Sequence, residues 1–254
     1  MQPLRIGCVP YLNAKPLIEG LVVSKGGNAA RIERLDVTLE PPSDLVEQLA
    51  AGRYDVALIP AIEVLRRGFA YVPGIAIASP GPTDSVRLWL MKPIEQVKVV
   101  ALDRNSRTTN ALTRIVLEKK YGVMARYIVG DPAKGLKGDA AVTIGDASFK
   151  DYGVPSLDLG TEWRAFTGKP FVFALWAYEK GHPRAAEICR TLKRPRPAIE
   201  PIVEREYRRV GISKERCRTY LTKCITYGLG PAERAGLRLF QKHARSLELE
   251  EARA

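Results

Sequence analysis

The sequence has few histidines and no long hydrophobic run, and each absence excludes a class of function. Only His182 and His243 occur among 254 residues, which leaves almost no basis for a histidine-based catalytic triad or a multi-histidine metal site. No apolar run approaches the roughly 20 residues that a membrane-spanning helix requires. The first residues also lack the apolar core of a signal peptide. We therefore expect a cytoplasmic protein with no metal and no membrane segment.

Cysteine is also scarce, and familiar cofactor motifs are missing. The four cysteines show no paired short spacing, so neither a zinc motif nor a redox motif is present. Cys217 and Cys224 fall on one helical face with Tyr220 and Leu221, which predicts core positions. There is no P-loop, no G-x-G-x-x-G after a strand, no H-E-x-x-H and no G-x-S-x-G. The sequence predicts no cofactor.

Acidic residues are outnumbered by basic ones. Forty Lys and Arg residues stand against 28 Asp and Glu residues, which gives a formal net charge of +12. Such an excess fits a solvated surface, the attraction of a small anionic substrate, or nucleic-acid binding. The basic residues concentrate between residues 180 and 223 without a zinc finger or an RNA-binding aromatic signature. We favour the solvated surface and expect no nucleic-acid partner.

Strands and helices alternate through the first two-thirds of the chain. This alternation is typical of an α/β fold with largely parallel sheets. After Gly181 the sequence predicts mainly helices. The predicted strands are residues 4–9, 35–39, 55–59, 75–79, 85–91, 97–102, 126–129, 140–144 and 171–178, and the predicted helices include 14–23, 43–52, 61–67 and 108–121.

Two of these extended segments, residues 85–91 and 171–178, have the character of paired crossovers between two lobes. They divide the chain into a discontinuous lobe I, residues 1–88 and 177–254, and a lobe II, residues 89–176. Because ligand sites are common at domain interfaces, we expect a ligand in the cleft between the lobes.

Four strand-to-helix junctions carry polar or small residues that would converge at such a cleft. The carboxyl ends of strands are where open α/β sheets bind ligands. The residues predicted to contact a substrate there are Tyr11 and Asn13; Pro60 and Ala61; Ser106, Arg107, Thr108 and Thr109; and Gly145 and Asp146.

The third junction is the richest in chemistry. Its hydroxyls, the Arg107 guanidinium and the free N–H groups of a helix start would form an anion cradle suited to a carboxylate. An ordinary helix cap at Ser106 is the alternative, and we favour the carboxylate site because capping does not need Arg107. Asp146, after Gly145, is either an N-cap or a ligand contact, and we favour the cap.

The opening Tyr11-Leu12-Asn13, followed by Pro16-Leu17, carries a resemblance that continues in order along nearly the whole chain. The chain resembles the family that contains chorismate dehydratase, the first enzyme of the futalosine route to menaquinone. The matching segments are residues 58–63, 72–79, 85–86, 100–103, 106–108, 144–147, 158–160, 162–163, 167–168, 170–174, 226–227 and 229–230.

The resemblance implies a two-lobed, periplasmic-binding-protein-like fold of type II. It also implies a hydro-lyase that converts chorismate into 3-[(1-carboxyvinyl)oxy]benzoate, with Asn13 and Ser85 as polar contacts at the reacting centre. Two departures bear on substrate fit. Ala61 stands where relatives often place Ser, and Arg104 and Asn105 stand where smaller residues are common.

Neither Asn13 nor Ser85 is a good base at neutral pH. We therefore hypothesise that the enolpyruvyl carboxylate of the substrate takes the proton, while the protein holds a reactive conformer and excludes water. The alternatives are a solute-binding protein and a ligand-sensing protein for a small carboxylate. A secretion signal would favour the first and a DNA-binding helical pair the second, and neither pattern is visible. The sequence does not predict an oligomeric state.

Overall fold

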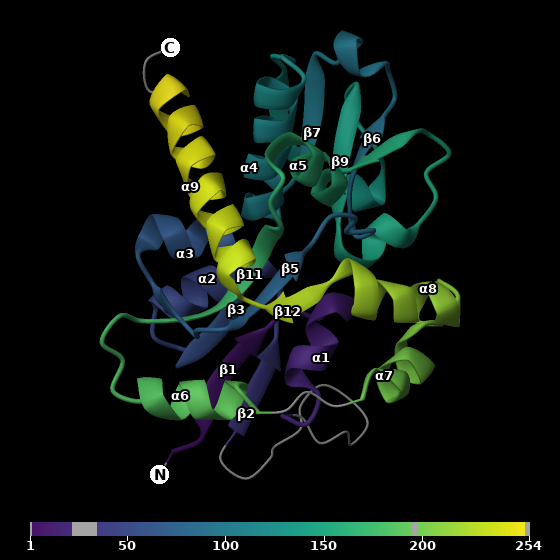
Figure 1. The fold of residues 1–254 in the computed structure, drawn as a ribbon. Helices are drawn as coiled ribbons and strands as arrows, with labels where there is room; N and C mark the ends of the chain where they lie inside the picture. The colour runs from purple at the N-terminus through teal and green to yellow at the C-terminus, as the bar shows by residue number, and fades with distance from the viewer. Residues whose placement is uncertain (1, 22–34, 195–197, 252–254) are drawn as a thin grey trace.

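The computed structural model describes residues 2–21, 35–194 and 198–251, which form two lobes, each built on its own sheet (Figure 1). The first sheet contains β1 (Leu4–Cys8), β2 (Leu35–Leu39), β3 (Val56–Pro60), β4 (Ala70–Tyr71), β5 (Ile75–Ser79), β11 (Phe171–Tyr178) and β12 (Thr226–Gly228). The second contains β6 (Val86–Leu90), β7 (Val99–Asp103), β8 (Arg126–Gly130), β9 (Ala140–Ile144) and β10 (Ser156–Asp158). The two-lobed α/β architecture predicted from the sequence is confirmed.

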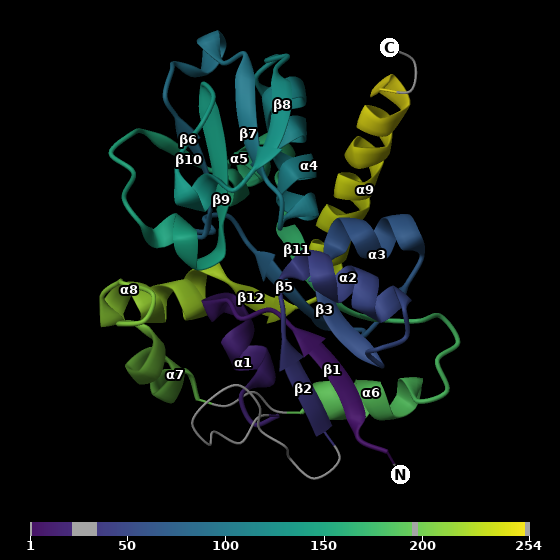
Figure 2. The ribbon, with the colours of Figure 1, turned by 180° about the vertical axis from the view of Figure 1, so that it is seen from behind.

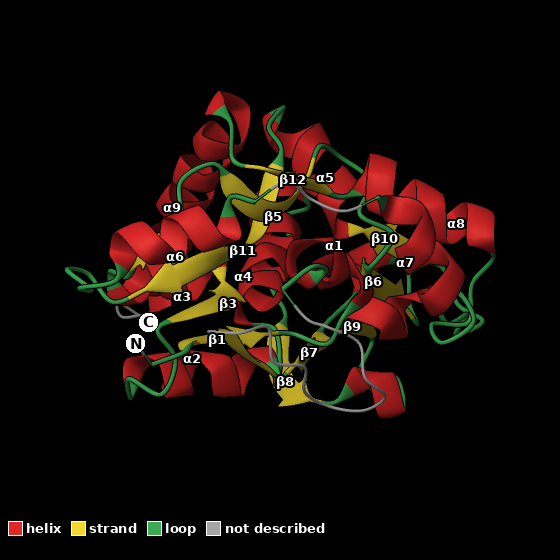
Figure 3. Ribbon diagram, turned by 90° about the horizontal axis from the view of Figure 1, so that it is seen from below, coloured by secondary structure: helices red, strands yellow, loops and turns green. Residues whose placement is uncertain are grey.

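Helices surround the strands of both sheets when the molecule is seen from below (Figure 3). The α-helices are α1 (Lys15–Ile18), α2 (Pro42–Ala50), α3 (Ala61–Arg67), α4 (Arg107–Ile115), α5 (Leu159–Thr167), α6 (Ala185–Leu192), α7 (Ile199–Glu206), α8 (Lys214–Thr219) and α9 (Pro231–Glu251). The shorter turns of helix are η1 (Leu12–Ala14), η2 (Ile94–Gln96), η4 (Pro132–Lys134) and η5 (Gly145–Phe149), and η3 (Val116–Lys120) and η6 (Tyr220–Cys224) are π-helices.

The amphipathic patterns place most of these helices well. In α2, for example, Leu45, Val46 and Leu49 are fully buried, as their spacing predicts. The predicted helix 14–23 is wrong in length, because α1 ends at Ile18 and Gly20 takes a left-handed φ of 80°. The end of that prediction, from residue 22, lies outside the described residues.

Both sheets are mixed, so the expectation of largely parallel sheets is only partly right. The strand orders are β12-β5-β11-β3-β1-β2 and β10-β6-β9-β7-β8. β1 runs parallel to β2 and β3, and β7 runs parallel to β8 and β9. β6 and β11 run antiparallel to their neighbours. The chain reaches each of these two strands from the other lobe. Parallel neighbours are instead joined by a crossover, usually a helix, within one lobe.

The chain changes sheets slightly earlier than the predicted lobe boundaries. β6 pairs wholly within the second sheet, and β11 wholly within the first. The crossings therefore lie between β5 and β6, residues 80–85, and between β10 and β11, residues 159–170. The predicted divisions at 88/89 and 176/177 cut through strands. An extended sequence pattern predicts a strand. Which sheet the strand joins depends on the neighbouring strand, which comes from elsewhere in the chain.

Each lobe has its own core, and helix α9 lies beside both. In Figures 1 and 2, α9 runs past α3 of one lobe and α4 of the other, and it packs against both. Its Phe240 ring meets Phe171 with the centroids 4.9 Å apart. The predicted core position of Cys217 is confirmed, while Cys224 is only half-buried.

Candidate functional site

A pocket between the lobes gathers side chains from all four predicted junctions. It lies at the carboxyl ends of β1, β3, β7 and β9, where the sheets of the two lobes face each other. Eight of the predicted site residues line it: Tyr11, Asn13, Pro60, Ser85, Ser106, Thr108, Thr109 and Gly145. A larger hollow beside α1 and α6 holds none of the predicted site residues.

Three predicted site residues, Ala61, Arg107 and Asp146, are not among those that line the pocket. Ala61 is fully buried in the core of the first lobe. Arg107 extends to α3, where its Nη1 lies 3.0 Å from Oε2 of the buried Glu63. Successive residues of a helix point about 100° apart, so Thr108 and Thr109 face the pocket while Arg107 does not. This geometry contradicts the prediction that Arg107 supplies the charge of the cradle.

Asp146 joins the lobes and does not cap its own helix. The structure shows no side-chain cap at the start of η5, so the favoured cap is wrong. One carboxylate oxygen accepts the N–H of Leu12 at 2.9 Å, and the other lies 2.9 Å from Nη2 of Arg209. Both partners belong to the first lobe. Asp146 therefore forms a clasp between η5 and the first lobe beside the pocket.

The third junction uses its hydroxyls to organise the start of α4. Ser106 Oγ accepts the N–H of Thr109 at 3.4 Å and donates to its Oγ1 at 2.8 Å. Thr108 Oγ1 accepts the N–H of Ile62, from the first lobe, at 3.2 Å. Ser106 is thus the N-cap that the sequence offered as the alternative. The helix start still faces the pocket, and its partial positive charge favours an anion there.

The pocket lining carries no charged side chain among the described residues. No Asp, Glu, Lys, Arg or His contributes to it. Tyr11 lines the pocket as well. Burial raises the pKa of its phenol, and the nearby charges of Asp103 and Asp146 add to that rise. Two buried oxygens of the lining, Asn13 Oδ1 and Thr83 Oγ1, have no hydrogen-bond partner within the part of the chain that the structure describes. Since buried polar atoms are nearly always partnered, these atoms indicate where a polar ligand is expected.

Asp103, at the end of β7, is a buried carboxyl that the sequence analysis did not single out. It accepts the N–H of the pocket-lining Asn105 at 2.8 Å. Burial, and then the charge of Asp131, raise the pKa of Asp103. Its position directly after a buried strand was a usable signal. Asp103 itself is not among the residues that line the pocket.

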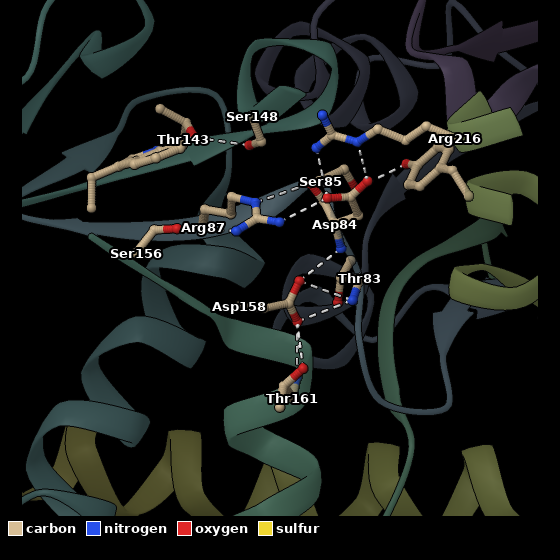
Figure 4. Close-up of polar contacts among 12 residues, drawn as sticks. Thr83, Asp84, Ser85, Arg87, Thr143, Ser148, Ser156, Asp158, Thr161 and Arg216 are labelled. Atoms are coloured by element: carbon tan, nitrogen blue, oxygen red, sulfur yellow. Dashed lines mark hydrogen bonds and ion pairs between the residues drawn. The ribbon is translucent and has the colours of Figure 1, made fainter. Parts of the chain in front are cut away.

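The segment that crosses from β5 to β6 is held by backbone contacts to the second lobe (Figure 4). Asp84 has a left-handed φ of 61°, which is uncommon for a residue with a side chain. The N–H groups of Thr83 and Asp84 donate to the Asp158 carboxylate at 3.0 and 2.7 Å. A Cβ at Gly160 would lie 1.9 Å from Thr83 Oγ1, so only glycine fits beneath the segment.

Charges from both lobes hold the Asp84 side chain (Figure 4). Arg216 of α8 donates through Nε and Nη2 at 2.9 and 2.8 Å, and Arg87 of β6 donates through Nη2 at 2.8 Å. Burial alone would raise the pKa of Asp84, but the bonds from Arg216 and Arg87 outweigh it and keep the pKa below its ordinary value. This bracing fixes the backbone beside Ser85.

Gly145 allows the lobes to approach each other at the pocket. Its φ is 59°, and a Cβ there would lie 3.0 Å from the Tyr11 ring. A side chain would therefore strain the backbone and push the ring away. Gly145 lines the pocket against Tyr11, and its contact with a substrate stays a prediction.

The described residues contain neither a cluster of metal-binding side chains nor a membrane-spanning helix. Within residues 2–21, 35–194 and 198–251, no three His, Cys, Asp or Glu side chains lie together where they could hold a metal ion. No helix in the same residues is both long enough and apolar enough to cross a membrane.

Comparison with solved structures gives the fold. A protein from Archaeoglobus fulgidus matches with a TM-score of 0.69 and 16% identity, over 97% of this chain and 98% of that one. The periplasmic aliphatic sulphonate binding protein from Escherichia coli matches with a TM-score of 0.64 and 16% identity, over 99% and 94%. The predicted periplasmic-binding-protein-like fold is confirmed.

Comparison with known sequences gives the family. Chorismate dehydratase from Thermus thermophilus is 27% identical in an alignment 267 positions long that covers 94% of each chain. The profile of a family described as menaquinone biosynthesis matches residues 4–246. Because that match spans nearly the whole chain, in agreement with the resemblance carried by its motifs, the chain belongs to the menaquinone biosynthesis family.

Proposed function

We propose that the protein is a chorismate dehydratase, a hydro-lyase that converts chorismate into 3-[(1-carboxyvinyl)oxy]benzoate and water. Family membership and the Thermus thermophilus relative support this function. The observation that carries it is the pocket between the lobes, which offers neutral hydrogen-bonding groups and a helix start but no charged side chain. Such a lining suits an anion that brings its own base.

The start of α4 binds one carboxylate of the substrate. Ser106, Thr108 and Thr109 line the pocket at this helix start, and the first N–H groups of a helix have no partner within the helix itself. Neutral donors of this kind stabilise an anion without a counter-charge. The formal net charge of +12 adds long-range attraction for a dianion.

The reaction removes the proton from C3 and the hydroxyl from C4 of the ring. The C3–H bond breaks, the enolpyruvyl carboxylate takes the proton, and the electron pair spreads through the diene toward the ring carboxylate. The C4–O bond then breaks, the ring becomes aromatic, and the departing hydroxide takes the proton to leave as water. The chain supplies position, hydrogen bonds and exclusion of water.

Asn13 and Ser85 provide the polar contacts at the reacting centre. Both line the pocket, Ser85 is 1% exposed, and the Asn13 side-chain oxygen has no partner among residues 2–21, 35–194 and 198–251. Ser85 donates to the C4 hydroxyl as it leaves, and Asn13 holds the enolpyruvyl group against the ring. The Asp146 clasp and the bond from Ile62 to Thr108 keep the lobes together around the substrate.

The direct test is incubation of the purified protein with chorismate, followed by ultraviolet and proton NMR spectra. We expect an aromatic product with an intact enolpyruvyl group. Absence of this product at high enzyme concentration contradicts the proposed activity, and tight binding without conversion indicates a solute-binding or sensing protein instead.

The proton acceptor is tested separately. A chorismate analogue with an amide in place of the enolpyruvyl carboxylate is expected to react far more slowly at saturation, because a missing base acts on the chemical step. Asp103→Asn is expected to keep most of the turnover. If the amide analogue reacts at the normal rate and Asp103→Asn loses its turnover, the proton acceptor is Asp103.

A further inference from the structure

Within the described part of the chain, the hydroxyl of Ser85 bonds to one side chain, which comes from the far end of the sequence. The Tyr220 hydroxyl donates to Ser85 Oγ at 2.8 Å across 135 residues. Both side chains are 1% exposed. A serine hydroxyl offers one proton and two lone pairs. The bond from Tyr220 occupies a lone pair, and the Ser85 proton has no acceptor among the described residues.

Tyr220 is held firmly enough to direct that bond. It begins the π-helix η6, and its ring stands edge-on to Phe149 with the centroids 5.0 Å apart. Four residues earlier, in α8, Arg216 donates two hydrogen bonds to the carboxylate of Asp84, the neighbour of Ser85. The α8–η6 run therefore holds the Ser85 segment at two adjacent residues, and π-helices are frequent at functional sites.

We propose that Tyr220 is a positioning residue that turns the Ser85 hydroxyl so that its proton points at the leaving hydroxyl of the substrate. This inference rests on the proposed dehydration. By filling one lone pair of Ser85 Oγ, the Tyr220 hydroxyl directs the Ser85 proton away from itself and toward the pocket that Ser85 lines. The same bond polarises Ser85 and makes it a better donor.

Tyr220 gives a hydrogen bond in this role and does not give up its proton. Burial raises the pKa of its phenol well above the ordinary value. A buried tyrosinate would be costly, so the proton stays on Tyr220 throughout the reaction. Its loss should therefore lower the rate of the chemical step without removing an acid from the pH profile.

The test is a double-mutant cycle with Tyr220→Phe, Ser85→Ala and the double variant, each assayed with chorismate. Tyr220→Phe keeps the ring against Phe149 and removes only the hydroxyl. We expect kcat to fall about three- to tenfold, the factor for one neutral hydrogen bond, with KM nearly unchanged. In the Ser85→Ala background, the same change should have no further effect on kcat.

The matched control is Tyr127→Phe, which removes the bond of a half-buried tyrosine hydroxyl to Glu118 in the second lobe. It is expected to leave kcat unchanged. Replacing Tyr220 with 3-fluorotyrosine keeps the ring and the donor, and should keep kcat at or above the wild-type value. This replacement also tests the inference if Tyr220→Phe does not fold.

The outcomes separate the inference from the proposed function. A wild-type protein that does not dehydrate chorismate overturns both. An active wild type overturns only the inference if Tyr220→Phe keeps full kcat, or if it slows Ser85→Ala as much as it slows the wild type. If the 3-fluorotyrosine protein also loses kcat, the packing of the Tyr220 ring explains the loss, and the inference is overturned as well.

Discussion

Two segments meet at the pocket, and they are built in opposite ways. The Ser106 cradle, residues 105–109, is organised mainly by bonds between near neighbours, such as Ser106 with Thr109. The Ser85 strap, residues 83–85, is held by Asp158, Arg216 and Tyr220, which lie 74 to 135 residues away in sequence. The cradle is a local structure that capping chemistry dictates, whereas the strap exists only when both lobes are folded.

The difference separates two tasks. A helix start fixed by its own cap offers N–H groups for a carboxylate and needs little support from the rest of the chain. A strained segment keeps its shape only if its surroundings over-determine it, and such segments concentrate at active sites. We therefore propose that the cradle serves mainly binding and the strap mainly chemistry.

The sharpest test of this assignment compares Ser85→Ala with Ser106→Ala. Removing the strap hydroxyl is expected to lower kcat about 100-fold, the loss typical of one donor at a developing charge, with little change in KM. Removing the cradle hydroxyl is expected to raise KM more than it lowers kcat. Steady-state kinetics with chorismate measures both, and a reversed pattern breaks the assignment.

The next test concerns the stability of the strap. Asp84→Ala removes the partner of Arg216 and Arg87 and is expected to lower the free energy of unfolding by about 2 kcal/mol, below the range for a fully buried pair because Arg216 is 39% exposed. Asp84→Gly should cost less, since glycine adopts the φ of 61° without strain. Urea unfolding measures the two variants. Equal losses would show that backbone strain at Asp84 contributes nothing.

The pH dependence of stability gives a smaller effect of defined sign. Because the native pKa of Asp84 is lowered, its charge stabilises the fold above the unfolded-state pKa of about 3.9, and that contribution is lost as the pH falls through the native pKa. The difference in unfolding free energy between wild type and Asp84→Asn should narrow as the pH falls below about 4. If this difference in unfolding free energy stays constant with pH, the charge of Asp84 is not what stabilises the fold.

The smallest effect is expected at Arg107, where sequence and structure disagree. Because Arg107 pairs with Glu63 outside the pocket lining, Arg107→Ala should leave KM within about twofold and cost less than about 1 kcal/mol of stability. Glu63 keeps Arg67 at 3.0 Å, which limits the loss. Arg104→Ala, in the same junction, is the matched control. A tenfold rise in KM for Arg107→Ala alone would restore the carboxylate role predicted from the sequence.

The sequence predicted many of the residues that line the pocket, because the signals that locate them are local. Strand ends followed by helix starts located Asn13, Pro60, Ser106 and Gly145, and all four line the pocket. The sequence-based prediction put the Arg107 side chain in the pocket. In the structure Arg107 pairs with Glu63, a partner that the sequence does not place beside it. Asp103 was available from the same strand-end rule but carries its raised pKa only once it is buried beside Asp131.

The sequence by itself determined the α/β fold, the junctions that carry the pocket and the family, since these follow from apolar periodicity, turn chemistry and motif order along the chain. Only the tertiary structure decided where the chain changes lobes, that Asp146 joins the lobes, and that Arg216 and Tyr220 grip the Ser85 strap. The physical reason is that these contacts join residues more than a hundred positions apart. Their geometry is fixed by how two separately built sheets dock, which no local pattern specifies.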